Sequence, residues 1–407
     1  MPQADAVPGD RSWRSAEFDR LLDFAEAALV RGRGFGWLDE DGRVDAERPF
    51  ELWITARMTH VFSLAALRGR PGADRFAAAG AELLSHTFAD AEHGGWVRSV
   101  DASGRPVDDA KACYEHAFVL LAASSATAAG APGAAELCAR AGDVITERFW
   151  REDEQRCVER YDRTWSDLEA YRGANANMHS VEAFLAAAGP EPQTSPWLDR
   201  ALAIATHLVD HAARANRWRV PEHFDPRWQP VPEYNRDRPA DPFRPFGATP
   251  GHALEWARLC LDLDAAVPSA PPWLLEAAEA LFATAVETAW AVDGRAGFVY
   301  TLDWSDRPVV SERMHWVAAE AVLAADALHR RTGDAGYRTW AERWWAHIEL
   351  DFVDRERGSW HHELDRDLQP SKSVWPGKPD AYHAVQAVLL PDLPLAPAPA
   401  WTLGAGG

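Results

Sequence analysis

The sequence predicts an all-α protein, a double-walled (α/α)6 barrel of six helical hairpins with short β-hairpin loops at one mouth. Three observations lead to this prediction. Short segments centred on an aspartate recur roughly every 62 residues along the chain of 407 residues. The stretches between them have room for two helices each, with apolar residues at three- and four-residue intervals. One helical stretch remains at each end of the chain, and these two stretches complete a sixth pair.

The recurring segments share an aromatic residue, a short β-like stretch, an aspartate and a turn. The aligned aspartates are Asp39, Asp101, Asp162, Asp225, Asp303 and Asp365. Asp and Gly favour turn conformations, so each segment predicts a short hairpin or an extended loop. The one long interval contains a Pro- and Arg-rich insertion between Asp225 and His252. We expect this insertion to fold over one mouth of the barrel.

The predicted helices form pairs, with the first helix of each pair in the inner wall and the second in the outer wall. The pairs are 51–67 with 73–88, 110–128 with 133–148, 177–188 with 196–213, 249–263 with 272–289, 311–330 with 335–351, and 378–390 with 14–31. An open helical solenoid is the competing architecture. Closure is favoured because the two chain ends supply the halves of one pair. Residues 1–407 are predicted to form one domain, with an irregular tail from about residue 391.

Composition excludes several classes of partner. The formal net charge of −20 argues against nucleic acids and against anionic membrane surfaces. The four cysteines are far apart and form no C-x-x-C pair, which is typical of reduced thiols. The N-terminus lacks a signal-peptide pattern, and the longest uncharged run, 117–135, is too short and too polar to cross a bilayer. We expect a cytoplasmic monomer or homodimer that acts on a small molecule.

Unusual polar residues occur on the predicted inner helices, at similar distances from the preceding repeat aspartate. They are Arg57, Tyr114 with His116, His179, His252, His315 with Trp316, and His383. Equivalent positions share one height in the barrel, so these side chains should converge on one mouth. A lone histidine on an apolar helix is more often a hydrogen-bonded structural residue. Histidines on several inner helices, together with one arginine, favour a site for a small molecule.

Two H-x-x-E pairs, His179 with Glu182 and His252 with Glu255, place imidazole and carboxylate on one helical face. The Glu can fix the tautomer and leave the other ring nitrogen free for proton transfer. The alternative is a pair that only stabilises the helix. Histidines with carboxylates can also bind a divalent ion, but no segment has a specific ligand spacing, so we expect no catalytic metal.

Other catalytic motifs are missing. The chain has no nucleophile elbow, no P-loop and no dinucleotide-binding motif, so we expect no cofactor. Glycoside hydrolases on the same barrel use two carboxylates, whereas imidazoles outnumber carboxylates at these positions. Trp53 and Trp316 lie on inner helices and are candidates for a sugar platform. These features favour proton transfer on a sugar over cleavage of a glycosidic bond.

Six segments carry a family resemblance: ITARMTHVFSLA (54–65), KACYEHAFVLLA (111–122), NANMHSVEAFLA (175–186), PGHALEWARLCL (250–261), MHWVAAEAVLA (314–324) and KPDAYHAVQAVL (378–389). Over nearly the whole chain they resemble the N-acylglucosamine 2-epimerase superfamily, (α/α)6-barrel enzymes that isomerise or epimerise sugars at C1 and C2. Within it, the chain looks most like the bacterial mannose isomerase branch, which includes sulfoquinovose isomerases.

The resemblance implies His252 and His383 as the acid/base pair. It also implies a set of residues that bind the sugar or orient the two histidines. They are Arg57, Tyr114, Asn175, Met178, His179, Arg244, Glu255 and Trp316. Trp53, His116 and Glu320 complete the candidates. In the second repeat the family often has Tyr-Asp-x-Ala-Phe, whereas this chain has an additional histidine at position 116.

The implied activity is an aldose–ketose isomerase that interconverts D-mannose and D-fructose through a cis-enediol intermediate, without metal or cofactor. A sulfoquinovose isomerase is the nearest alternative and would need cationic groups such as Arg236, Arg238 or Arg244. A 2-epimerase acting on cellobiose or N-acylglucosamine is the next alternative. An (α/α)6 glycosidase or lyase, and an inactive sugar-binding protein, are more distant alternatives.

Overall fold

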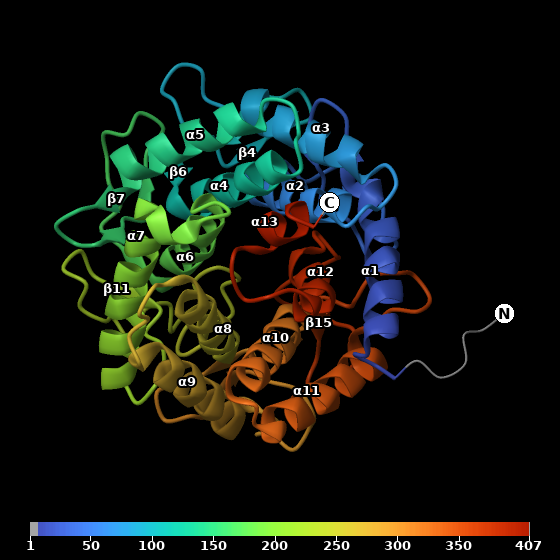
Figure 1. Cartoon of the computed structure of the whole chain (residues 1–407), viewed down its shortest axis with the longest axis vertical. Helices are drawn as coiled ribbons and strands as arrows, with labels where there is room; N and C mark the ends of the chain where they lie inside the picture. Colours follow the sequence, from blue (N-terminus) through green and yellow to red (C-terminus); the bar gives the residue numbers. More distant parts are fainter. Residues whose placement is uncertain (1–6, 407) are drawn as a thin grey trace.

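Two concentric rings of helices make up the described part of the chain, residues 7–406, in a computed structural model (Figure 1). The inner ring contains α2 (Leu52–Leu67), α4 (Cys113–Ala128), α6 (Ala174–Ala187), α8 (Pro250–Ala266), α10 (His315–Thr332) and α12 (Tyr382–Leu389). The outer ring contains α1 (Arg11–Ala25), α3 (Ala73–His86), α5 (Ala134–Val144), α7 (Pro196–Ala205), α9 (Trp273–Ala289) and α11 (Ala335–His347). The predicted (α/α)6 barrel is therefore confirmed, with α12 and α1 as the sixth pair.

Hydrophobic patterning explains which helices form which ring. In the inner helix α2 every residue from Leu52 to Ala65 is buried, including polar ones, so the helix has no solvent face. In the outer helix α3 the buried residues include Phe76, Ala77, Gly80 and Ala81, which form one apolar stripe. Short additional turns follow several helices: η1 (Glu26–Ala28), η2 (Ile145–Phe149), η3 (Pro192–Thr194), η4 (Thr206–Ala213), η5 (Ile348–Phe352) and η6 (Leu390–Asp392).

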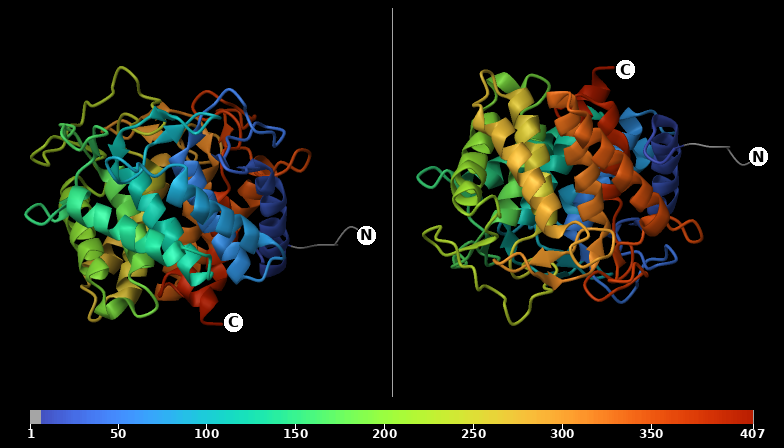
Figure 2. Two further views of the ribbon diagram at one scale, coloured as in Figure 1. Left: turned by 90° about the horizontal axis from the view of Figure 1, so that it is seen from above. Right: turned by 90° about the horizontal axis from the view of Figure 1, so that it is seen from below.

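Short antiparallel strands lie together at one end of the barrel (Figure 2). They are β1 (Leu29–Val30), β2 (Gly34–Phe35), β3 (Phe50–Glu51), β4 (Ser99–Val100), β5 (Pro106–Asp108), β6 (Lys111–Ala112), β7 (Trp150–Arg151), β8 (Arg156–Cys157), β9 (Arg160–Tyr161), β10 (Arg172–Gly173), β11 (His223–Phe224), β12 (Thr301–Leu302), β13 (Pro308–Val310), β14 (Arg313–Met314) and β15 (Glu363–Leu364). The prediction that short hairpins lie together at one mouth is thus confirmed.

The segment before each inner helix pairs with the hairpin of the next repeat. Strand β3 pairs with β4, β6 with β9, β10 with β11, and β14 with β15. Ala248 forms a bridge with Leu302 in the same way. The backbone N–H of Lys378 donates to the carbonyl oxygen of Leu38 at 2.9 Å, which joins the last repeat to the first. This hydrogen-bonded ring satisfies the backbone groups of the loops and closes the barrel.

The repeat aspartates stabilise the turns that they were used to find. One carboxylate oxygen of Asp39 accepts hydrogen bonds from the backbone N–H groups of Asp41 and Arg43, both at 2.9 Å. Asp303 does the same for Ser305 and Arg307. The other four repeat aspartates also accept from backbone N–H groups of their own turns. An Asp recurs because its short side chain can satisfy the donors of a tight turn.

The C-terminal tail differs from the prediction of an irregular segment. Residues Pro399–Gly404 form a short helix, α13, at the end of the barrel opposite the hairpins (Figures 1 and 2). The indole N–H of Trp401 donates to the carbonyl oxygen of Ala186 at 2.8 Å, and Asp392 forms an ion pair with Arg14 at 2.5 Å. Composition concealed this order because Pro, Ala and Gly dominate the tail.

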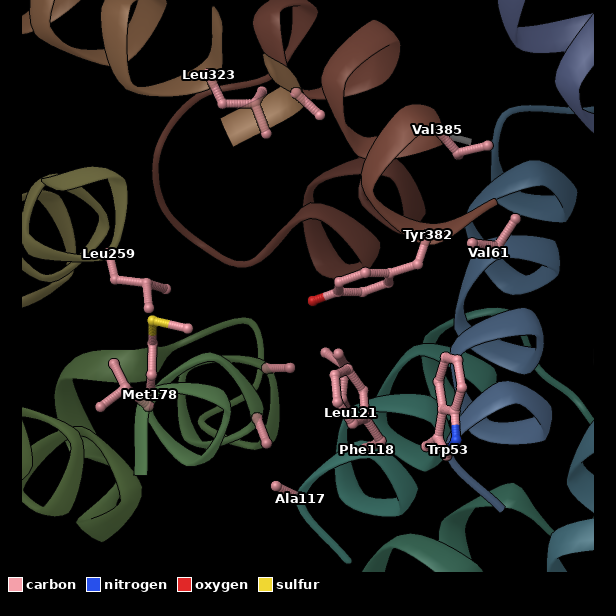
Figure 3. Close-up of a cluster of buried hydrophobic side chains, with 14 of the residues drawn as sticks. Trp53, Val61, Ala117, Phe118, Leu121, Met178, Leu259, Leu323, Tyr382 and Val385 are labelled. Carbon is pink, nitrogen blue, oxygen red and sulfur yellow. The ribbon is translucent and has the colours of Figure 1, made fainter. Parts of the chain in front are cut away.

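The barrel axis is filled by side chains from the inner ring. Figure 3 shows Trp53, Phe118 and Tyr382 among the aromatic members of this core, with aliphatic residues such as Val61, Leu259 and Leu323 around them. Within residues 7–406, no helix combines the length and the apolar character needed to cross a membrane.

Candidate active site

A cavity of about 650 Å³ opens at the hairpin mouth, above the packed axis of the barrel. All six inner helices contribute to its lining, through Trp53, Arg57, Tyr114, Asn175, His179, His252, Glu255, His315, Trp316 and His383. Each of these lies in the first two turns of its helix, which explains why the repeat predicted their shared height. A second cavity, about 820 Å³, lies beneath the C-terminal segment, and its walls are largely aliphatic.

His252 and His383 both line the upper cavity, and each is held by a carboxylate. The Nδ1 atom of His383 lies 2.9 Å from Oε1 of Glu320, and Nδ1 of His252 lies 2.9 Å from Oε1 of Glu222. An ionised carboxylate only accepts hydrogen bonds, so each Nδ1 carries a proton and Nε2 is the ring nitrogen left for proton transfer. The Trp316 ring lies beside both imidazoles, with centroid distances of 5.3 Å to His252 and 5.7 Å to His383.

The expected pairing within H-x-x-E is wrong for His252. Its partner is Glu222, which directly precedes β11, rather than Glu255 on the same helix. In the second motif, Nδ1 of His179 lies 3.6 Å from Glu182 and 3.7 Å from Glu255, beyond hydrogen-bonding distance. Helical spacing places two side chains on one face, but partners from neighbouring elements approach the ring more closely.

His383 is joined through Glu320 to a buried network of charged side chains. The guanidinium Nε of Arg258 donates to Oε2 of Glu320 at 3.0 Å. Burial alone would raise the pKa of Glu320, but Arg258 and His383 outweigh it, and the pKa is lowered. Burial lowers the pKa of His383, although Glu320 opposes this shift. The pair is therefore an ionised carboxylate beside a neutral imidazole, which is the form that a general base requires.

The pKa of Glu255 is shifted in the opposite direction from that of Glu320. Burial, followed by the negative charge of Glu320, raises the pKa of Glu255 well above its usual value. The neutral acid is favoured, and its side chain lines the cavity. A protonated carboxyl group at this position can donate a hydrogen bond to a sugar oxygen.

Arg57 places a positive charge at the cavity wall. It donates to the hydroxyl oxygen of Tyr114 at 2.9 Å and to Asp380 at 3.3 Å. Its guanidinium group stacks 4.4 Å from the ring centre of Phe118. Nearby, Oδ1 of Asn175 is buried and has no hydrogen-bond partner within residues 7–406. Both side chains can contact a ligand hydroxyl, Arg57 as a donor and Asn175 as an acceptor.

His179, Glu182 and Glu255 hold potential metal-ligating atoms within 4.8 Å of one another. The Nη2 atom of Arg258 lies 3.8 Å from both carboxylates. These three side chains could ligate a divalent ion, and the guanidinium of Arg258 is a positive charge that would compete with it.

Two predicted residues lie outside the cavity because they face another way on their helices. Met178 is fully buried and packs near Leu259 in the barrel core (Figure 3). His116 donates through Nδ1 to the carbonyl oxygen of Ala112 at 2.7 Å and accepts through Nε2 from the backbone N–H of Trp96 at 3.2 Å. Both residues therefore have structural positions, and their assignment to the sugar pocket is not supported.

Arg244 also lies outside the lining of the cavity. It forms a two-pronged ion pair with Glu169, at 2.9 and 3.0 Å, and stacks over Tyr171 at 4.0 Å. Glu320 lies beneath the cavity and contacts His383 instead of contributing to the wall. It is a positioning residue by geometry.

Several wall residues come from loops and were missing from the candidate set. They are Phe243, Tyr300, His362, Trp375 and Asp380, together with Glu222 behind His252. Asp380 was within a quoted motif, KPDAYHAVQAVL, where a polar residue before the helix was the available signal. The other five lie in the hairpins or the insertion, where helical periodicity carries no information.

Comparison with known proteins gives one consistent result. The family model described as N-acylglucosamine 2-epimerase (GlcNAc 2-epimerase) matches residues 34–387. A D-mannose isomerase from Thermobifida fusca is 52% identical over 398 residues, which covers 98% of each chain. A D-mannose isomerase from Pseudomonas cannabina pv. alisalensis is 50% identical, over 96% of this chain and 94% of that protein.

A solved structure has the same architecture. The crystal structure of a D-mannose isomerase superposes with a TM-score of 0.88 and 28% identity, covering 95% of this chain and 98% of that one.

Proposed function

Because the chain belongs to the N-acylglucosamine 2-epimerase family, we propose that it is an aldose–ketose isomerase that interconverts D-mannose and D-fructose. The observation that carries the proposal is the pair of carboxylate-held imidazoles, His252 and His383, beside one tryptophan in one cavity. The likeness to two D-mannose isomerases over nearly the full chain supports this choice of sugar.

The proposed reaction begins with ring opening, in which His252 moves the proton from O1 to the ring oxygen. The neutral Nε2 of His383 then removes the proton from C2, and the C–H electrons form the C1–C2 double bond of an enediolate. Arg57 stabilises the negative charge on oxygen. His383 returns its proton to C1 while His252 transfers a proton from O2 to O1. The product is the open form of the ketose.

One base on one face of the sugar suffices for this sequence, because C2 and C1 are adjacent in the planar enediolate. Epimerisation requires instead that a proton return to the opposite face of C2. The carboxylate-held His383, poised as a neutral base with a lowered pKa, supports the single-base route.

The charge of the cavity favours mannose over sulfoquinovose. Among the described residues that line it, Arg57 is the single cationic side chain, and it is paired with Asp380. Arg236, Arg238 and Arg244 lie outside the lining. A sulfonate would enter without a free positive partner, which carries a large desolvation cost. A neutral hexose needs no such partner.

The test uses mannose, sulfoquinovose and cellobiose in separate incubations in deuterated buffer, followed by proton NMR. We expect fructose from mannose, with deuterium exchanged at the C1 and C2 positions. His383→Asn, which keeps a polar side chain but removes the base, should abolish both signals. Turnover of sulfoquinovose or cellobiose without turnover of mannose would contradict the proposed substrate.

A further inference from the structure

We propose that His315 is a specificity-determining residue whose Nε2 atom accepts a hydrogen bond from a non-reacting hydroxyl of the sugar. This inference rests on the proposed function for the identity of the ligand. It concerns another imidazole of the cavity wall, separate from the two that are assigned to proton transfer.

The tautomer of His315 is fixed by its own backbone surroundings. Its Nδ1 atom lies 3.2 Å from the carbonyl oxygen of His362, and its backbone N–H donates to the same oxygen at 3.1 Å. A carbonyl oxygen accepts and never donates, so Nδ1 carries the proton. The Nε2 atom is therefore an unprotonated acceptor.

That acceptor belongs to a side chain of the cavity wall. The His315 ring lines the cavity and is 5% exposed, and Nε2 is buried without a hydrogen-bond partner among residues 7–406. Buried polar atoms in folded proteins are nearly always paired. Burial lowers the pKa of His315 to about 3, so the ring remains a neutral acceptor across the physiological range.

The ring is also held rigidly. It stacks on His362 with a centroid separation of 3.8 Å and an interplanar angle of 25°. His315 is the first residue of α10, and the adjacent Trp316 lies beside both catalytic imidazoles. A fixed acceptor discriminates between ligands more strongly than a mobile one, because it cannot relax toward another partner.

Its position indicates which part of the sugar it contacts. The ring centre lies 6.5 Å from that of His383. With His383 acting at C1 and C2, we place His315 beside the next carbons of the open chain. The contacted group must donate a hydrogen bond, which a hydroxyl does and an ionised phosphate or sulfonate does not. The inference is therefore a contact with the hydroxyl at C3 or C4.

The test compares wild type, His315→Phe and His315→Gln on D-mannose and on its 3-deoxy and 4-deoxy analogues. Phe keeps the ring and removes the acceptor, whereas the Gln side-chain oxygen can restore it. We expect His315→Phe to lower kcat/KM for mannose by about ten- to hundred-fold, with partial recovery in His315→Gln. The difference between wild type and His315→Phe should shrink to about threefold for the one deoxy sugar that lacks the contacted hydroxyl.

A matched control is His211→Phe, the same chemical change at an exposed position of the outer wall. It should leave the kinetics on all three sugars unchanged. An equal loss in His315→Phe for mannose and both deoxy sugars, or no advantage of Gln over Phe, would overturn the inference and leave His315 a packing residue.

Calorimetric binding of the same sugars separates this inference from the proposed function. If wild type binds mannose but does not isomerise it, the proposed function fails, and the deoxy-sugar comparison of binding still decides the role of His315. Absence of mannose binding by wild type would overturn both.

Discussion

Glu320 bridges two buried partners, with Oε1 at 2.9 Å from Nδ1 of His383 and Oε2 at 3.0 Å from Nε of Arg258. The carboxylate is fully buried, and these two contacts hold its orientation. It orients the imidazole, and its charge stabilises the imidazolium that forms when His383 takes a proton.

Replacement of Glu320 by Gln should lower kcat for mannose by roughly 10² to 10³-fold with a small change in KM. The amide oxygen can still accept from Nδ1, but the negative charge is lost. Without this charge the pKa of His383 falls further, so the acid limb of the kcat profile should move to lower pH. An unchanged acid limb would mean that the charge of Glu320 does not influence the pKa of His383. Circular dichroism checks that the variant folds.

Glu222 and Glu255 offer a comparison between the observed partner of His252 and the expected one. We expect Glu222→Gln to reduce kcat by roughly 10- to 100-fold, because His252 loses its charged partner. Glu255→Gln should act mainly on KM, because its side chain lines the cavity and retains a hydrogen-bond donor. Steady-state kinetics on mannose separate the two effects. A kcat loss in Glu255→Gln alone would reverse the assignment.

Met178 tests whether the pocket was placed correctly on α6. Met178→Leu conserves volume in a fully buried site, so the unfolding free energy should change by less than about 1.5 kcal/mol. The value of KM for mannose should remain that of wild type. His179→Asn, one residue further along the helix, should raise KM or lower kcat because its ring lines the cavity. A raised KM for mannose in Met178→Leu would indicate that Met178 contacts the sugar after all.

His60 makes stability depend on pH in a way that one substitution isolates. Burial lowers its pKa to about 4 from an ordinary value of 6.5. Between these values the unfolded chain binds a proton at His60 and the folded chain does not, so stability falls as pH falls. We expect wild type to lose about 1.4 kcal/mol per pH unit relative to His60→Gln between pH 6 and pH 4.5. Urea unfolding at several pH values measures this difference. Parallel stability curves would mean that His60 titrates normally in the folded protein.

Helix positions and the height of the site were predictable from the sequence because they follow from the repeat and from helical periodicity. The face of each helix was less certain, since adjacent positions point in directions about 100° apart. Met178 and His179 are adjacent on α6, yet His179 lines the cavity and Met178 is buried in the core. Glu222 was not predictable, because its contact with His252 joins a loop to a helix across the insertion. Arg244 illustrates the same difficulty, as its partner Glu169 belongs to a different repeat.

The backbone contact between Lys378 and Leu38 gives the molecule a seam where its two ends meet. In an open array of repeats the outermost units have one neighbour and fray first, whereas here each hairpin is flanked on both sides. The outer helix α1 and the inner helix α12 complete one unit from opposite ends of the chain. During synthesis, the inner wall and the cavity can therefore form only after the last inner helix, which carries His383, has been made. The same short segment, α12, closes the ring of helices and supplies the last histidine of the cavity.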